Sequence, residues 1–158
     1  MNTATVLALA FAIGMIDGLR SMTAPAVVAW AARLKWLDLH NSFLAFMGSA
    51  VAAYIFTAAA IVEFVVDKLP KTPSRKDALG LTARIALGGL SGAAVCAPAN
   101  HSIALGALLG VAGGVAGAFA GYEVRTRLVR ALNVPDIVIA LLEDAVAIGG
   151  GFLIVSRF

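Results

Sequence analysis

Two pairs of carboxylates stand inside otherwise apolar segments, where acidic side chains are rare. Glu63 and Asp67 are four residues apart and therefore share one face of a helix. Glu143 and Asp144 are adjacent and lie deep within another apolar run. Because two close carboxylates cannot both ionise easily at low dielectric, each pair is a candidate site for a cation or a relayed proton.

Further charged residues accompany these acids. Asp17 and Arg20 stand near the end of the first apolar segment, and Arg84 lies near the start of a later one. A charge at the centre of a bilayer costs about 2.5–3.5 kcal/mol on insertion scales, so such groups need a partner or a water-filled cavity. The candidate residues of a polar pathway or an ion-pair network are Asp17, Arg20, Glu63, Asp67, Lys68, Arg84, Glu143 and Asp144.

Two interpretations of this set remain open. In the first, the charges only pair helices, with Arg84 joined to Glu63 or Asp67, and Arg20 joined to Asp17 or to the adjacent acidic pair. In the second, the clustered carboxylates line a polar cavity, where they bind a cation or relay protons.

Other kinds of reactive site lack their characteristic patterns. The sequence has a single cysteine, Cys96, and its two histidines, His40 and His101, lie in different segments, so no zinc spacing occurs. The Gly-x-Ser-x-Gly and His-Glu-x-x-His motifs are absent, and the glycines lie in apolar helices rather than in a phosphate-binding loop. We therefore expect neither enzyme activity nor a cofactor.

The composition is that of an integral membrane protein. Of 158 residues, 61% are hydrophobic and only 13% are charged, whereas a soluble domain carries about 25% charged residues. A soluble protein of this size could not hide so much apolar surface, which excludes an ordinary cytosolic enzyme, a nucleic-acid-binding module and a disordered chain. The pI of about 9.4 is typical of basic membrane-protein loops. We expect a multi-pass protein of the cell inner membrane, with the lipid bilayer and no nucleic acid as partner.

About five segments have the length of a membrane-spanning helix, which needs about 20 apolar residues. The first lacks the positively charged start of a signal peptide, so we expect it to be retained as a helix. The sequence predicts an all-α polytopic membrane protein, a single domain over residues 1–158. Its spans are 1–16 with a continuation to Arg20, 41–62 with a continuation to Leu69, 78–97, 102–122 and 137–156.

Two stretches fit this layout less easily. Residues 23–37 are too short to cross, and Arg33, Lys35 and Trp36 suit a membrane interface. Residues 121–132 carry three arginines and are typical of an interfacial helix or a helix extension. Both stretches are expected along or just inside a membrane face, with a re-entrant course for 23–37 left open.

The same stretches reveal a weak internal repeat. Residues 24–34 align with 118–128, and residues 49–52 align with 144–147 after one gap. On the predicted layout three crossings separate the copies, so the second would be inverted, as in many secondary transporters. The repeat halves would be 1–62 and 95–158.

The loop charges predict the orientation. The 69–77 loop and the 121–135 stretch hold most of the Lys and Arg residues, and Arg20, Arg33, Lys35 and Arg157 fall on the opposite side. The positive-inside rule therefore favours a cytoplasmic N-terminus and a cytoplasmic 69–77 loop. With an odd number of spans, the termini would lie on opposite faces.

Glycines at four-residue spacing predict close helix packing. The fourth span carries two such ladders, at residues 106, 110 and 114 and at residues 113, 117 and 121. Small residues let helix backbones approach inside lipid, either within one subunit or between subunits. Because five short helices offer little internal surface, we expect a homo-oligomer.

Three motifs resemble a family of small bacterial membrane proteins catalogued as domain of unknown function forty-one twenty-six. They are Gly18-Leu-Arg-Ser-Met22, Glu63-Phe-Val-Val-Asp-Lys-Leu-Pro70 and Leu142-Glu-Asp-Ala145. The resemblance spans nearly the whole chain. It implies a polar signature made of Arg20, Glu63, Asp67, Lys68, Asp77, Arg84, Glu143 and Asp144. Many members have a His-Ala-like segment where this chain has Tyr122-Glu123. The family implies no activity.

The Glu-x-x-x-Asp-Lys motif also resembles, more faintly, the Glu-x-Gly-Asp-Lys motif of small cation exchangers built from repeats. That likeness favours a cation over an anion. The leading hypothesis is a transporter or channel for a small ion or solute, cation- or proton-coupled, with its carboxylates facing a polar cavity. The alternative is a non-transporting structural or assembly protein whose charges only pair helices.

Overall fold

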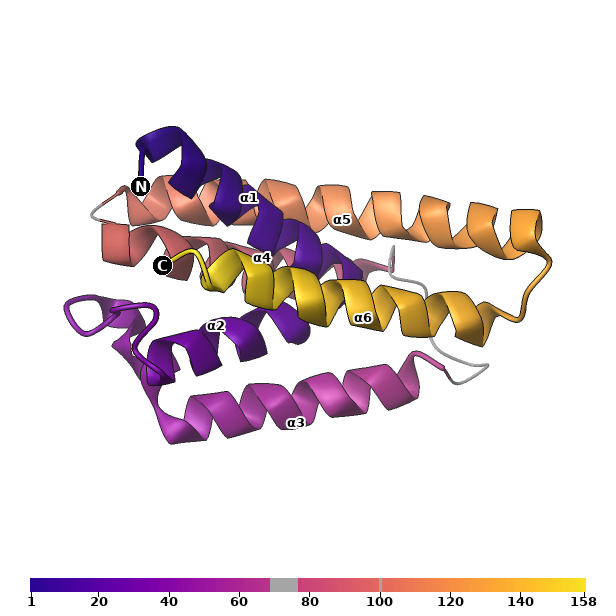
Figure 1. Ribbon diagram of the computed structural model, residues 1–158, viewed down its shortest axis with the longest axis horizontal. Helices are drawn as coiled ribbons and strands as arrows, with labels where there is room; N and C mark the ends of the chain where they lie inside the picture. The colour runs from indigo at the N-terminus through magenta and orange to yellow at the C-terminus, as the bar shows by residue number, and fades with distance from the viewer. Residues whose placement is uncertain (69–76, 100) are drawn as a thin grey trace.

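The chain folds into six α-helices and two short 3₁₀ helices over residues 1–68, 77–99 and 101–158, which the computed structural model describes (Figure 1). No strand occurs in these ranges. The elements are α1 (Thr3–Leu19), α2 (Thr23–Arg33), η1 (Phe43–Gly48), α3 (Ala50–Val66), α4 (Ala78–Cys96), η2 (Ala97–Ala99), α5 (Ile103–Leu132) and α6 (Asp136–Val155).

Three helical segments are long and apolar enough to cross a membrane. They are α4 with η2, α5, and α6, which run over Ala78–Ala99, Ile103–Leu132 and Asp136–Val155. The other two predicted spans contain α1 and α3, apolar helices of 17 residues each. Large apolar side chains such as Val51, Ile55 and Val62 of α3 are exposed, as expected for a surface that faces lipid. The chain is an all-helical protein of membrane character.

Polar side chains set several helix boundaries. The side chains of Asn2, Ser49 and Ser102 each accept a hydrogen bond from a backbone N–H in the first turn of α1, α3 and α5. Such caps satisfy donors that a helix start leaves unpaired. Asn133 ends α5 in the left-handed conformation, with φ of 50°, which asparagine tolerates better than most residues. Local sequence therefore determines where these helices begin and where α5 ends.

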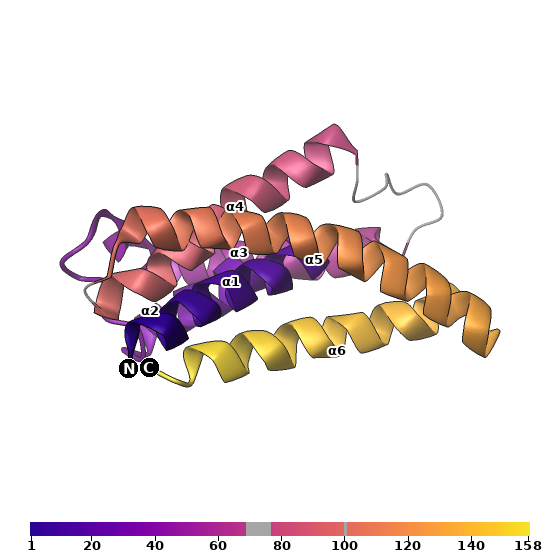
Figure 2. The same cartoon turned by 90° about the horizontal axis from the view of Figure 1, so that it is seen from above.

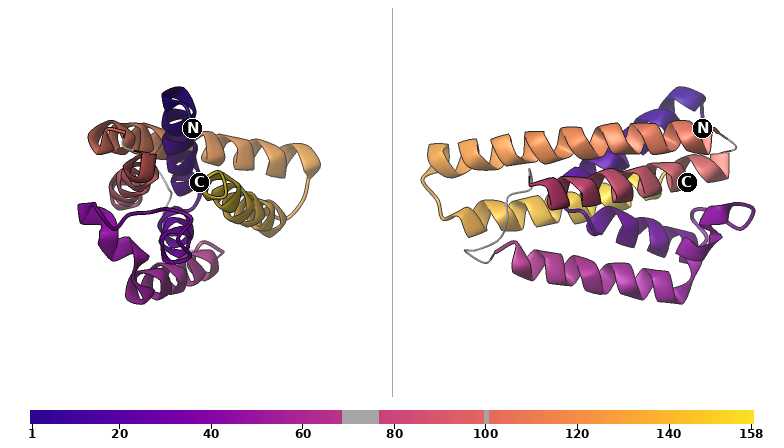
Figure 3. Two further views of the ribbon diagram at one scale, coloured as in Figure 1. Left: turned by 60° about the vertical axis from the view of Figure 1, so that its left-hand side comes forward. Right: turned by 180° about the vertical axis from the view of Figure 1, so that it is seen from behind.

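Most of residues 23–37 lie in the interior of the bundle rather than along a surface, and the re-entrant course stays a prediction. Nine of the 11 residues of α2 are buried, and Figure 3 shows the helix inside the bundle, between α1, α3, α4 and α6. Alanines make this possible, because their small side chains let four neighbouring helices approach. Only the end of the segment, around Lys35 and Trp36, is exposed.

Two other predicted boundaries need comment. Residues 121–132 extend α5 without a break to Leu132, so the helix-extension alternative is confirmed. The second predicted span, from residue 41, does not begin as an α-helix. Its start forms η1, and α3 begins only at Ala50, where the Ser49 cap allows a helix to start.

The prediction that the termini lie on opposite faces is wrong for this fold. Figure 1 and Figure 2 show both termini at one end of the bundle, because α1 runs away from that end and α2 returns toward it. The end of α3 and the start of α4 lie toward the opposite end. The N-terminus and these flanks of the 69–77 loop therefore do not share a face. Residues 69–76 themselves lie outside the described residues.

We expect cysteines at Ala4 and Ser156 to react with an impermeant maleimide from the same side of the membrane. Both positions are exposed, and they lie in the terminal segments that share one end of the bundle. A cysteine at Ala131, at the far end of α5, should react from the other side. The measurement uses a Cys96→Ala background, and labelling of Ala4 and Ser156 from opposite sides would contradict the helix directions.

The glycine ladders pack within one subunit. A side chain on Gly110 would meet the backbone of Gly88 and Gly92 in α4, and one on Gly14 would meet the backbone of Gly110. The second ladder faces α1, where a side chain on Gly117 would meet the backbone of Met15. Among the described residues, the glycines join α1, α4 and α5 of one chain, so packing within a subunit is the alternative that the structure supports. This packing holds in place the helix ends that carry the charges.

Candidate functional site

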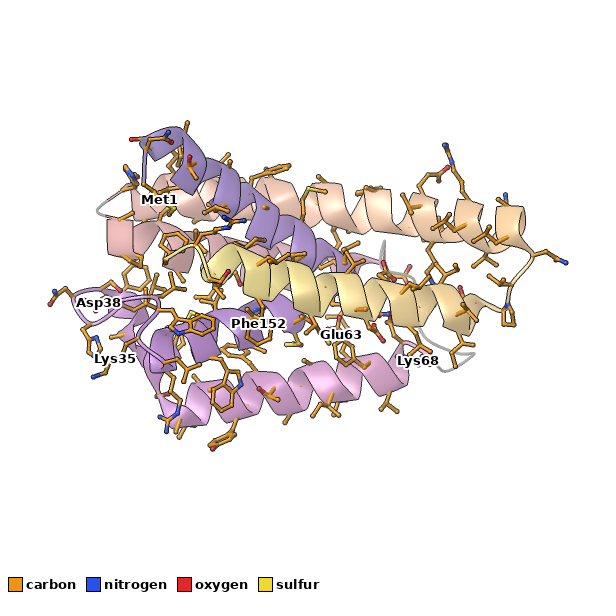
Figure 4. The ribbon with its side chains drawn as sticks, in the orientation of Figure 1. Met1, Lys35, Asp38, Glu63, Lys68 and Phe152 are labelled. Carbon is orange, nitrogen blue, oxygen red and sulfur yellow. The ribbon has the colours of Figure 1, made fainter. Side chains whose placement is uncertain are left out.

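Charged side chains from five helices meet where α1 and α3 end, alongside α4, α5 and α6. Figure 4 labels two of them, Glu63 and Lys68, which lie between α3 and α6. We call this group the charge cluster and define it as Asp17, Arg20, Glu63, Asp67, Lys68, Arg84, Arg125, Glu143 and Asp144. It contains all eight candidate residues of the sequence analysis together with Arg125.

Arg20 is the centre of the cluster. Its side chain is fully buried and contacts Asp67 of α3. Its Nε lies 2.7 Å from Oδ1 of Asp144, and its Nη2 lies 3.7 Å from Oε2 of Glu143. Arg20 has extended backbone angles at the end of α1, where the chain turns into α2. A planar guanidinium can serve several carboxylates at once, and here it joins α1, α3 and α6.

Lys68 provides a second cation beside the same acids. Its Nζ lies 2.7 Å from Oδ2 of Asp144 and donates to the backbone carbonyl of Phe64 at 2.8 Å. Asp144 is therefore held between two cations, one on each carboxylate oxygen. Such pairing offsets part of the cost of burying the charge.

Glu63 binds the turn between α1 and α2. Its Oε1 accepts hydrogen bonds from the backbone N–H and the Oγ of Ser21, both at 2.8 Å. Its Oε2 accepts one from the backbone N–H of Met22 at 2.9 Å. These N–H groups precede the first turn of α2, where a carboxylate is favoured by unpaired donors and by the helix dipole. Glu63 thus fixes the chain reversal that buries Arg20.

Arg84 of α4 makes the predicted approach to Glu63, with Nη2 3.9 Å from Oε1. Its other donors bind backbone carbonyls, since Nε donates to Gly18 and Nη1 to Gly80, each at 3.0 Å. The absence of a side chain at Gly18 leaves room for α5, whose backbone a Cβ there would meet. Arg84 therefore connects the end of α1 to α4 and α3.

Asp17 is the exception in the cluster. Its side chain is fully buried, and neither carboxylate oxygen has a hydrogen-bond partner among the described residues. The predicted pairing of Arg20 with Asp17 does not form there, because the end of α1 directs Arg20 toward α3 and α6. Instead, Asp17 faces glycines: a Cβ on Gly88 would lie 3.5 Å from its Oδ2, and one on Gly114 would lie 3.8 Å away.

Arg125 is the cluster residue that the sequence analysis did not select. Its guanidinium binds Asp136 through Nε at 2.9 Å and approaches Oε2 of Glu143 at 3.4 Å and Oδ2 of Asp67 at 3.9 Å. The hairpin of α5 and α6 could have indicated this contact. Arg125 and Glu143 each lie nine residues from Val134 in the turn, so antiparallel helices place them side by side.

An apolar crevice of about 280 Å³ reaches the cluster between α1, α5 and α6. Met15, Leu19, Val124 and Leu142 are among the residues that line it. Arg125 and Glu143 are the charged residues on its wall. The surface of the crevice is almost wholly apolar, and Glu143 borders it at the edge of the ion-pair network.

The remaining signature positions are less central. Asp77 is exposed and precedes α4, and Tyr122 and Glu123 lie on the outer part of α5. Glu123 pairs with Arg127 four residues later, at 2.7 Å.

Comparison with known proteins gives a family but no activity. Searches of curated proteins and of solved structures found no match. The model of a family described as a domain of unknown function, DUF4126, matches residues 7–156. The matched range contains every residue of the charge cluster and all three motifs that carried the resemblance. The chain belongs to the DUF4126 family.

Proposed function

We propose that this protein is a multi-pass inner-membrane transporter or channel for a small ion or solute, cation- or proton-coupled, that uses the carboxylates of the charge cluster. The observation that supports it most is the position of Glu143. This residue both lines the 280 Å³ crevice and lies within reach of Arg20 and Arg125. Ionisable groups in membrane segments are costly, and they commonly mark ion or substrate pathways.

Shared partners in the cluster support a switching role. Arg20 contacts Asp67, Glu143 and Asp144, and Arg125 approaches two of the same acids. When one carboxylate binds a proton or a cation, the arginine that it releases still has other acids to hold it. A network with alternative pairings can therefore take two arrangements of similar energy, as alternating access requires.

Several finer features belong to the same proposal. With both termini at one end of the bundle, the number of crossings would be even: α3, α4, α5 and α6 would cross, and α1 and α2 would enter and leave from that end (Figure 1). An inverted repeat is supported by direction: α2 runs toward the termini, whereas residues 118–128 within α5 run away from them (Figure 1). A homo-oligomer would cover part of the exposed apolar surface of α3 and α6.

A structural role is the second candidate, and specific contacts favour it. Asp144 lies between Arg20 and Lys68, and Glu63 accepts three hydrogen bonds from the α1–α2 turn. Helix pairing alone therefore explains why the cluster contains two of its five carboxylates, Glu63 and Asp144. The candidates differ in what happens when charges are neutralised together.

Flux measurements with purified protein in liposomes separate the two candidates. We expect wild-type protein to dissipate an imposed pH or cation gradient, and Glu143→Gln to lose this flux while it stays folded. The exposed loop variant Asp38→Asn is the matched control and should transport like wild type. If wild type moves no ion, and if Lys68→Met with Asp144→Asn restores the stability that each single change loses, the charges only pair helices.

A further inference from the structure

Asp17 differs from the other carboxylates of the cluster, because no hydrogen bond of its side chain with the described residues joins one helix to another. It is fully buried, and neither of its oxygens accepts a hydrogen bond there. A buried carboxylate without a donor is among the costliest groups in a protein, and the neutral acid is far cheaper. A chain that needed only helix packing at this position would be more stable with an apolar residue. The acid therefore calls for a functional explanation.

The surroundings of Asp17 suit a proton better than a metal ion. The carboxyl faces Gly88 of α4 and Gly114 of α5, which supply no side-chain oxygen. Metal ions of the alkali and alkaline-earth groups are held by several oxygen ligands, and the described residues contain no group of three acidic, histidine or cysteine side chains placed to hold a metal ion. A proton needs only one carboxylate oxygen.

The charged groups around Asp17 come from every side of the bundle. Arg84 of α4 binds the carbonyl of Gly18, the next residue, at 3.0 Å, and Glu63 of α3 is the nearby acid that adds repulsion. Arg20 at the end of the same helix is directed to Asp67, Glu143 and Asp144, and Arg125 of α5 is directed to Asp136 and Glu143. If Asp17 were ionised, Arg84 would therefore be the cation available to pair with it.

We propose that Asp17 is a proton-binding site, whose carboxyl takes a proton from the aqueous phase and returns it. With the proton bound, Arg84 remains on Gly18 and Glu63. When the proton leaves, the negative charge on Asp17 attracts Arg84 away from Glu63, which loosens the α1–α2 turn. This inference rests on the proposed transport function and names the proton as the coupling ion.

Infrared spectroscopy of the purified protein in nanodiscs tests the site without any transport assay. We expect wild type at neutral pH to show the carbonyl stretch of a protonated carboxylic acid, and ¹³C labelling of aspartate carboxyls to shift it. The band should vanish in Asp17→Asn and in Asp17→Ser, whose smaller side chain avoids overpacking against the glycines. It should remain in Asp38→Asn, because hydrogen bonds from the His40 side chain and backbone lower the pKa of that exposed acid.

Three results would overturn the inference. They are the absence of a protonated aspartate band in wild type at neutral pH, its survival in both Asp17 variants, and its loss when Na⁺ is added at constant pH. The first shows that Asp17 is ionised, the second shows that another aspartate carries the band, and the third shows that a metal ion takes the place of the proton. If the band behaves as expected but wild-type liposomes move no ion, the proton site stands and the transport function fails. If ions move without the band, the reverse holds.

Discussion

Replacing Arg20 with methionine should destabilise the protein by about 3–5 kcal/mol, the range observed when one partner of a buried ion pair is removed. Methionine fills much of the space but leaves Asp67, Glu143 and Asp144 without their shared cation. The three acids then repel each other in a site with little water. Thermal unfolding in detergent measures the loss.

Two variants make the Arg20 prediction specific. Arg20→Lys keeps the positive charge but not the planar group that reaches three acids, so it should recover only part of the stability. Arg127→Met removes an arginine whose side chain is 76% exposed and pairs with the exposed Glu123 four residues earlier, so it should change stability by less than about 0.5 kcal/mol. If Arg20→Met unfolded at the same temperature as Arg127→Met, the cluster would not hold the helices together.

Leucine at Gly110 or Gly117 should disrupt the bundle, with a loss at or above the upper end of the about 1–3 kcal/mol typical of overpacking. Even a Cβ on Gly110 would overlap the backbone of Gly88, and one on Gly117 would overlap the backbone of Met15. Backbone atoms cannot rotate away as a flexible side chain can. The expected signs are a lower unfolding temperature and aggregation in detergent.

Gly149 is the matched control for the glycine ladders. It lies in α6, within the same apolar environment, yet a Cβ there would meet no atom within 4 Å. Gly149→Leu should therefore be tolerated, and replacing glycine in a helix can even add stability. Equal behaviour of leucine at Gly110 and at Gly149 would mean that the ladder does not mediate helix contact.

Much of the helical layout followed from the sequence, because apolar runs and turn residues are local signals. The predicted spans at 78–97, 102–122 and 137–156 correspond closely to helices that are long enough to cross a membrane. Charged residues inside these runs were also a reliable guide, since burying them is costly wherever they lie. For that reason all eight selected residues fall within one cluster.

The missed features depend on tertiary contacts. Nothing local distinguishes a short alanine-rich helix at an interface from one in the interior. The burial of α2 depends on the helices that surround it, as at Gly151 of α6, where a Cβ would lie 3.2 Å from Val27. Arg125 was missed because its neighbours suggested a membrane surface. The lack of hydrogen-bond partners for Asp17 among the described residues could not be predicted either, because Arg20, three residues away in the sequence, turns to the other side.

The reversal of the chain between α1 and α2 sets an order for biosynthesis. Arg20 is made early, whereas Asp67 follows after α3 and Asp144 belongs to the last helix. Until those helices arrive, neither the arginine nor the N–H groups of Ser21 and Met22 have their final partners, and lipid offers none. The first hairpin must therefore wait near water or inside the insertion machinery. It becomes buried only when the C-terminal helix has been delivered, so a truncated chain could not complete this step.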